Sequence, residues 1–174
     1  MHSMTRTLSS VVFATLIFSS TAAVGQTVVG DSQVTSVVQR LFVAMRASDT
    51  AATRSAFVAN GRVIPINPGG QAATLGQGLT IDQFVAFVGR NAPGVWIERL
   101  WSPAVLTTGP LADLWFEYDV YRGATFDHCG INSVQLQETT TGWKIVTMAF
   151  TSVTQGCASH PAPTPPLHDL GFSL

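Results

Sequence analysis

The residues best suited to chemistry gather in the carboxyl-terminal half of the chain, around a single histidine. His128 is the only histidine between residues 26 and 158. Imidazole exchanges protons near neutral pH, so His128 is the candidate catalytic base. Tyr118 and Asn132 carry groups able to orient a carbonyl, and Phe116 would supply an apolar wall. A histidine on an apolar face is also compatible with a structural role, with Asn132 as its hydrogen-bond partner.

These side chains share one face if the hairpin that carries them has a three-residue loop at residues 123–125. Facing residues of an antiparallel pair have position numbers with a constant sum, which fixes every partner once the loop is chosen. Apolar residues then meet apolar residues along the pair, as a core face requires. The pairs that we predict are His128 with Val120, Gly130 with Tyr118, and Asn132 with Phe116.

A two-residue loop would shift the pairing by one residue and produce a different site. His128 would then face Asp119 or Glu117, a carboxylate–imidazole pair able to do acid–base chemistry. The same shift would set Val134 and Leu136 against polar positions, which is unfavourable for a core face. In the register that we predict, no carboxylate is securely on the pocket face. The outer face then carries Asp113, Trp115, Glu117, Asp119 and Tyr121.

Three amphipathic or capped segments predict helices ahead of this hairpin. Apolar side chains recur at helical spacing over residues 31–48. A Thr and a Gln three residues apart form a capping box at the start of the third segment. The predicted helices are residues 31–48, residues 49–58 ended by Asn60–Gly61, and a segment opened by Thr80 and Gln83.

The rest of the chain is rich in β-forming residues. A short strand is predicted over residues 62–66, before the third helix, and four longer ones follow it. Their connections are too short for anything but hairpins, so they form an antiparallel meander. Helices packed on one face of a strongly curved sheet would bury every apolar stripe, which predicts an α+β fold in the order α-α-β-α-β-β-β-β. The long strands are predicted over residues 95–107, 111–122, 127–139 and 143–153.

Several short segments of this meander carry a resemblance to a known superfamily. They are Ala112-Asp113-Leu114-Trp115, Tyr118-Asp119-Val120-Tyr121, His128-Cys129-Gly130, Gly142-Trp143-Lys144-Ile145 and Gly156-Cys157. With the order of elements over residues 31–157, they resemble the nuclear transport factor 2-like superfamily, which has a cone-shaped α+β fold. The series is similar to exported bacterial members of the superfamily, sometimes described as lumazine-binding-like or polyketide-cyclase-like. The superfamily includes isomerases, dehydratases and epoxide hydrolases, and also many members without known chemistry, so the resemblance implies a pocket and not a reaction.

The amino terminus has the pattern of a cleavable export signal. A basic start is followed by an apolar run over residues 8–18 and then by small residues, with cleavage expected before Gln26. The run is shorter than the roughly 20 residues that a transmembrane helix needs. We therefore expect a signal peptide at residues 1–25, a domain at residues 26–158 and a Pro-rich disordered tail at residues 159–174. The mature protein would be periplasmic or secreted, with no membrane span.

Export makes a disulfide between Cys129 and Cys157 possible. With a last loop at residues 140–142, Cys129 faces Val153, and Cys157 would lie about 13 Å farther along a straight strand. A disulfide requires Cα atoms within about 7 Å, so the bond forms only if the chain turns back at Gly156. We predict that it does; the alternative is one buried free cysteine and one mobile one.

Charge and composition exclude several classes of partner. The formal net charge is −1 and charged residues make up only 11% of the chain, so no basic field attracts nucleic acid. One histidine, two distant cysteines and scattered acids do not form a metal site, and the glycine-rich loop after Pro68 lacks a phosphate-binding pattern. No cofactor is expected.

Three functions remain open on the sequence. The first is a non-catalytic pocket for a small, mostly apolar molecule. The second is an isomerase, dehydratase or cyclase in which His128 acts as base and Tyr118 or Asn132 orients a carbonyl. The third is a homodimer that buries the outer sheet face, where Trp101, Trp115 and Tyr121 would supply the aromatic contacts.

Overall fold

The computed structural model describes residues 31–67 and 74–163. The expected signal peptide, part of the glycine-rich loop and the end of the tail lie outside these residues. The helices are α1 (Asp31–Arg46), α2 (Thr50–Ser55) and α3 (Ile81–Val88). The strands are β1 (Phe57–Asn67), β2 (Thr74–Leu75), β3 (Leu79–Thr80), β4 (Trp96–Thr108), β5 (Leu111–Arg122), β6 (Thr125–Thr139) and β7 (Gly142–Thr151).

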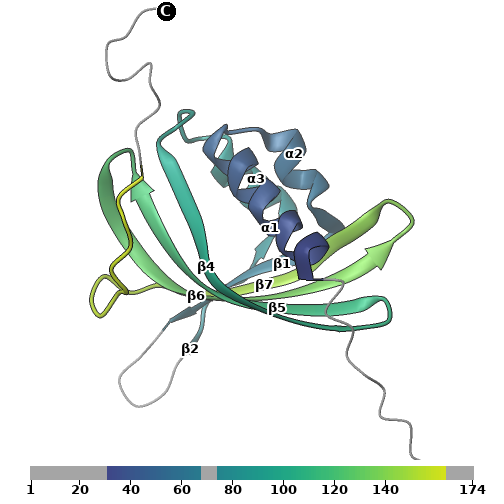
Figure 1. Ribbon diagram of the computed structural model, residues 1–174. Helices are drawn as coiled ribbons and strands as arrows, with labels where there is room; N and C mark the ends of the chain where they lie inside the picture. The colour runs from purple at the N-terminus through teal and green to yellow at the C-terminus, as the bar shows by residue number, and fades with distance from the viewer. Residues whose placement is uncertain (1–30, 68–73, 164–174) are drawn as a thin grey trace, which may run out of the picture.

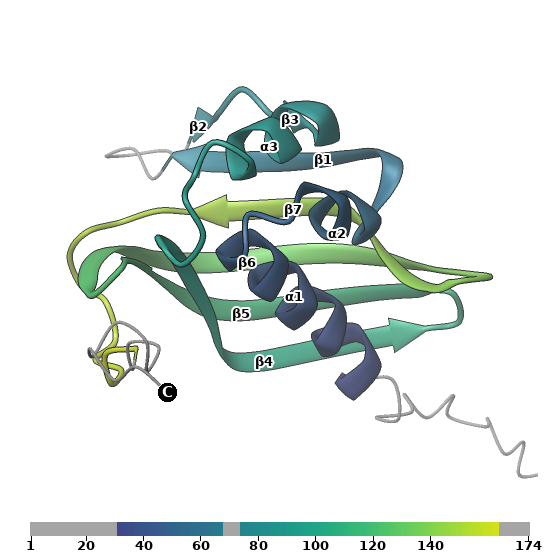
Figure 2. The ribbon, with the colours of Figure 1, turned by 90° about the horizontal axis from the view of Figure 1, so that it is seen from above.

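The strands form one strongly curved sheet, and the three helices lie in its concave side (Figure 1). The strand order is β2-β1-β7-β6-β5-β4, with β3 paired to β1. The view from above shows α1 crossing the long strands while α2 and α3 lie toward β1 and β7 (Figure 2). The pairs β4–β5, β5–β6 and β6–β7 are antiparallel, which confirms the predicted meander, whereas β1 runs parallel to β7.

The core lies between α1 and the concave face of the sheet. The predicted apolar stripe of α1 is buried and the polar side of the helix is exposed. The α+β architecture predicted from the sequence is therefore confirmed. The main contributors to the core are Val34, Val38, Leu41 and Met45 of α1, Leu114, Phe116 and Val120 of β5, and Val134 and Leu136 of β6.

The predicted second helix is too long. Asp49 does cap α2, by accepting a hydrogen bond from the Ala52 amide at 2.9 Å, but the helix ends at Ser55. Phe57 instead begins β1, pairs with Ile145 of β7, and is buried. Gly61 lies where the β1–β7 register shifts, and a Cβ there would meet main-chain oxygens at 3.2 Å. Residues 57–61 are therefore strand with a bulge, because pairing with a distant strand overrides their local helical pattern.

Candidate functional site

The hairpin between β5 and β6 has the short turn of one alternative considered from the sequence and the residue pairing of the other. Its turn has two residues, since Arg122 pairs with Thr125, yet His128 faces Val120 as the longer loop predicts. The register shifts between Val120 and Tyr121, which identifies a β-bulge in β6. The extra residue opposite this step is Asp127. All the predicted pairs from His128 onward are confirmed, and the bulge sets the Asp127 carboxylate beside the histidine.

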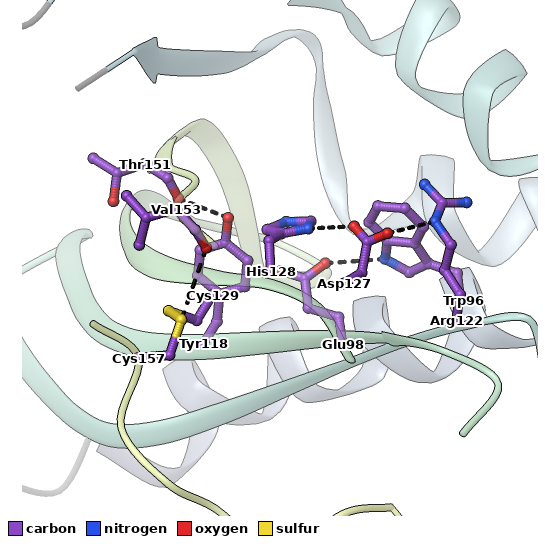
Figure 3. A network of polar contacts seen from close by, with 10 residues as sticks. All are labelled: Trp96, Glu98, Tyr118, Arg122, Asp127, His128, Cys129, Thr151, Val153 and Cys157. Carbon is purple, nitrogen blue, oxygen red and sulfur yellow. Dashed lines mark hydrogen bonds and ion pairs between the residues drawn. A yellow bond between two sulfur atoms is a disulfide. The ribbon is translucent and has the colours of Figure 1, made fainter. Parts of the chain in front are cut away.

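The Asp127 carboxylate joins His128 to an arginine. The His128 Nδ1 lies 2.6 Å from Asp127 Oδ2, and Arg122 Nε donates to Asp127 Oδ1 at 2.7 Å. Figure 3 shows this line of three side chains. The hydrogen bond with His128, followed by the contacts of Arg122, lowers the pKa of Asp127 despite partial burial. An ionised Asp127 holds the proton on Nδ1, which leaves Nε2 as the basic nitrogen; among the described residues, Nε2 has no hydrogen-bond partner.

The concave face at this hairpin contains a cavity of about 260 Å³. Glu98 of β4 and His128 of β6 flank Val120 in one row across three strands, and Tyr118 lies in the next row. Apolar side chains make most of the wall, and few polar groups interrupt it. The lining residues are Met45, Val63, Leu79, Phe84, Phe87, Trp96, Glu98, Tyr118, His128, Met148, Phe150 and Ser152.

Glu98 is the carboxylate that lines this cavity. Its oxygens accept hydrogen bonds from Trp96 Nε1 at 3.3 Å and from Asn132 Nδ2 at 3.4 Å. Burial raises the pKa of Glu98 to about 7, against these two hydrogen bonds and with a smaller contribution from Asp119. Within residues 31–67 and 74–163, no arginine, lysine or histidine forms an ion pair with Glu98. The expectation of a pocket face without a carboxylate is therefore wrong.

Tyr118 is held rigidly at the wall of the cavity. Its hydroxyl donates to the Thr151 carbonyl at 2.7 Å (Figure 3). Gly130 faces it, and a Cβ there would come within 2.8 Å of the tyrosine ring and would collide with the Thr151 carbonyl oxygen. Burial and the nearby Glu98 carboxylate raise the pKa of Tyr118 well above its usual value. Tyr118 is therefore a neutral phenol that only a glycine at position 130 accommodates.

The two remaining predicted site residues lie behind the cavity. Phe116 is completely buried and packs edge-on against Phe42, with ring centroids 6.0 Å apart. Asn132 is also completely buried; its amide nitrogen reaches Glu98, and its Oδ1 has no partner among the described residues. The structure thus brings Tyr118 and His128 together on the cavity wall and leaves Phe116 and Asn132 outside the lining.

Sequence reasoning missed Asp127 and Glu98. Asp127 directly precedes His128, and the two residues would normally point to opposite faces of a strand. The sequence did hold a signal for Asp127. A two-residue turn and the pairing of His128 with Val120 can both be present only if a bulge separates the turn from His128. Glu98 lies in a stretch correctly predicted as a strand, and the predicted connection at residues 108–110 would already have set it opposite Val120; the structure reaches this pairing through a two-residue turn and a register shift between Trp101 and Ala104.

The outer face of the same strands carries a paired cluster. Arg99 donates to both oxygens of Asp119, at 2.8 and 2.6 Å, and Trp101 donates to Asp119 at 3.1 Å. The Arg99 guanidinium also stacks on Trp101 and on Tyr121. Of the three aromatic residues considered for a dimer interface, Trp101 and Tyr121 are partly covered, and Trp115 is 46% exposed.

The start of the carboxyl-terminal tail packs on this cluster. His160 stacks on Trp101 with ring centroids 4.0 Å apart, and the Pro161 carbonyl accepts a hydrogen bond from Arg99. We expected residues after 158 to be disordered; those up to residue 163 are described and contact the sheet. The predicted disulfide explains the path of this segment. It joins Cys129 to Cys157 with Cα atoms 5.9 Å apart, Val153 pairs with Cys129 as predicted, and Gly156 makes the turn with φ of 74°.

Two other classes of site find no support in the part of the chain that the structure describes. No group of three or more histidine, cysteine, aspartate or glutamate side chains there is placed to hold a metal ion. No helix there is long and apolar enough to cross a membrane.

Solved structures with this architecture are known. One is a protein of unknown function with a cystatin-like fold from Nostoc punctiforme (TM-score 0.58, 10% identity, 81% of this chain and 97% of that one). A nuclear transport factor 2-like protein from Novosphingobium aromaticivorans matches with a TM-score of 0.58 and 19% identity, over 75% and 86% of the two chains. The chain has the nuclear transport factor 2-like fold.

A third structure with the nuclear transport factor 2-like fold has a suggested activity. It comes from Streptomyces avermitilis, is described as a proposed dehydratase, and matches with a TM-score of 0.56 and 16% identity over 72% of this chain and 96% of that one. No protein-family model matches the sequence, and no curated protein matches it. At these identities the similarity concerns the fold alone, with which a ligand-binding or an enzymatic role is compatible.

Proposed function

We propose that this protein binds a small, mostly apolar molecule in the cavity on the concave face of its sheet. The observation that carries the proposal is the cavity itself, where aromatic and aliphatic side chains surround a few polar groups. Such a combination is typical of small-molecule sites, in which the apolar wall contributes affinity and the polar groups fix orientation. At about 260 Å³ the cavity lies just below the usual range of about 300–1,000 Å³, which favours a small molecule.

A blocked cavity tests this proposal. Ser152 lines the cavity but is exposed, so Ser152→Trp fills the space without disturbing the core. We expect tert-butylbenzene to shift the NMR signals of cavity residues, above all the Trp96 indole, and to shift none of them in Ser152→Trp. Gln135→Trp, on an exposed position of β6, is the matched control and should bind as the natural chain does. Equal binding to the blocked variant would contradict the proposal.

The second candidate function is proton transfer on the bound molecule, as in an isomerase or a dehydratase. The Asp127–His128 pair favours it, because a carboxylate that holds Nδ1–H orients the ring and stabilises the imidazolium formed when Nε2 takes a proton. In this mechanism Nε2 removes a proton from carbon next to a carbonyl, and the imidazolium later returns a proton to the substrate. Glu98, with a pKa near 7, is a second group able to exchange protons at neutral pH.

Deuterium exchange tests this candidate without knowledge of the natural substrate. Acetophenone is a small apolar ketone, and its methyl protons exchange with D₂O when a base removes them. We expect the protein to accelerate this exchange, His128→Gln to abolish the acceleration, and Asp127→Asn to lower it by about 100-fold or more. His160→Gln, on the outer face, is the control and should leave the rate unchanged. An unchanged rate in His128→Gln would exclude this histidine as the base.

We also propose that the protein acts outside the cytoplasm after removal of residues 1–25. The leader pattern and the Cys129–Cys157 disulfide support this location, since such bonds persist in oxidising compartments. Amino-terminal sequencing of the exported product should give Gln26 or a residue close to it. Recovery of Met1 on a cytoplasmic product would contradict the proposal.

Self-association through the outer face remains a proposal that Trp115 supports. Its ring is exposed on β5, and Leu106 and Leu111 are exposed nearby on the β4–β5 hairpin. A homodimer that buries these side chains should become a monomer in Trp115→Glu, as measured by light scattering after gel filtration. A natural chain that elutes as a monomer at micromolar concentration would contradict it.

A further inference from the structure

Glu98 is a carboxylate in an apolar cavity, and no cationic side chain among the described residues pairs with it. Its partners are Trp96 and Asn132, at 3.3 and 3.4 Å, and both are neutral donors at long distance. A buried carboxylate is costly unless it is paired or protonated. Asn132 behind it is fully buried with an unpaired Oδ1, so the polar side of the cavity is incompletely satisfied by the described residues.

The surrounding charges do not neutralise Glu98 from within the protein. Arg99 is engaged by Asp119 on the opposite face of the sheet, and Arg122 is engaged by Asp127. Arg122 stacks on the Trp96 ring, yet it forms no ion pair with Glu98. No lysine or arginine is among the residues that line the cavity within the described part of the chain. A ligand anion would therefore meet an uncompensated negative group, whereas a ligand cation would pair with it.

The rest of the wall is also suited to a cation. Aromatic rings present a negative face to a positive charge, and the attraction is strongest where water is excluded. Five aromatic side chains besides His128 line this one cavity: Phe84, Phe87, Trp96, Tyr118 and Phe150. They come from α3, β4, β5 and β7, so the rings surround the space from several sides.

We infer that the cavity binds a small organic cation, an amine or quaternary ammonium with an apolar body, whose positive charge pairs with Glu98. This inference rests on the proposed function and narrows it, since it names the class of molecule and the residue that selects it. The apolar body of the ligand contacts the aromatic wall, and its charge replaces the partner that Glu98 lacks in the protein.

Three compounds of nearly equal size test the inference on the natural chain. Phenyltrimethylammonium and tert-butylbenzene have the same shape and differ by one charge, and benzenesulfonate carries a fixed negative charge. At about pH 8, where Glu98 is ionised, we expect the cation to bind about tenfold or more tightly than tert-butylbenzene. Benzenesulfonate should not bind. The readout is the Trp96 indole NMR signal, because this N–H donates to Glu98.

A pair of variants assigns the preference to Glu98. Glu98→Gln keeps the shape and removes the charge, so it should lower the affinity for phenyltrimethylammonium by about tenfold and leave tert-butylbenzene within about twofold. Glu138→Gln, at an exposed position of β6, is the matched control and should change neither. If Glu98→Gln does not fold, the three-compound comparison on the natural chain still decides the inference.

The outcomes separate the inference from the proposed function. Equal or stronger binding of tert-butylbenzene would overturn the inference and leave the proposed apolar site standing. Stronger binding of benzenesulfonate, or an unchanged cation affinity in Glu98→Gln, would overturn the inference as well. If none of the three compounds shifts the Trp96 signal, both the inference and the proposed function fail.

Discussion

Two carboxylates on neighbouring strands, Asp119 on the outer face of the sheet and Glu98 on the concave face, differ in whether a cationic side chain pairs with them. Asp119 on the outer face is 4% exposed and receives two hydrogen bonds from Arg99 and one from Trp101. Glu98, which precedes Arg99 in the chain, points to the concave face and has no cationic partner among the described residues. Asp119 is buried and Glu98 is half-buried at the cavity wall, and the two acids lie on neighbouring strands.

The comparison separates a structural cluster from a binding site. In the outer-face cluster, the charges of Arg99 and Asp119 pair with each other, and Trp101 and the start of the tail complete their contacts. On the concave face, three groups lack partners among the described residues: Glu98 has no cation, and the Oδ1 of Asn132 and the Nε2 of His128 have no hydrogen bond. A group that is costly to bury and that its own protein does not pair is a candidate for function.

The largest effect that we expect is on the outer face, from loss of the disulfide. The double variant Cys129→Ser/Cys157→Ser should lower the free energy of unfolding by about 3.5 kcal/mol, because the bond closes a loop of 28 residues' separation in the unfolded chain. Urea denaturation measures it, with the reduced natural protein as a second comparison. A change below about 1 kcal/mol would show that the outer segment does not depend on the bond.

The Arg99–Asp119 pair should give the next largest effect. Asp119→Ala leaves a partly buried guanidinium without its carboxylate and should lower the free energy of unfolding by about 3 kcal/mol. Asp113→Ala removes an exposed carboxylate from the same face of β5 and should change it by less than about 0.5 kcal/mol. Similar values for the two variants would break the contrast between paired and unpaired acids.

Glu98→Gln should raise the free energy of unfolding, by an amount that depends on pH. The pKa of Glu98 is about 7 in the folded protein, against an ordinary value of about 4.5 in the unfolded chain, so ionisation opposes folding. Below about pH 4.5 both states are protonated, and the variant should match the natural chain. As the pH rises from 4.5 through 7 the natural chain loses stability, so the variant becomes more stable by about 3 kcal/mol at pH 8. Thermal unfolding from pH 4 to 8 measures this; a variant that is less stable at pH 8 would mean that Glu98 is paired.

Truncation should give the smallest effect. Ending the chain after Ala158 removes the His160 stack on Trp101 and the Pro161 acceptor of Arg99, and should lower the free energy of unfolding by about 1 kcal/mol. Ending it after Pro163 retains both contacts and serves as the reference. Equal melting temperatures for the two chains would show that residues 159–163 contribute nothing to stability.

Much of the fold could be predicted because its signals are local or periodic. The stripe of α1 and the capping box of α3 require only nearby residues, and the places of the hairpins were also predicted, although the loops predicted at residues 123–125 and 140–142 are two-residue turns. The pairing of β5 with β6 followed from matching apolar positions, and it correctly set Gly130 beside Tyr118. The disulfide was predicted because two unpaired thiols are unusual in an oxidising compartment, and the pairing of Cys129 with Val153 meant that the bond required a turn at Gly156, which the structure has.

The sequence by itself therefore determined the α+β architecture, the inner and outer faces of the hairpin and the position of His128. Only the tertiary structure decided which carboxylates reach the histidine and the cavity. Asp127 reaches His128 because a bulge inserts one residue into β6. Glu98 reaches the cavity because β4 pairs with β5 through a two-residue turn and a register shift between Trp101 and Ala104. Strand residues alternate between faces, so a shift of one position moves a side chain from solvent to cavity, and that shift is set by contacts between strands and not by the local sequence.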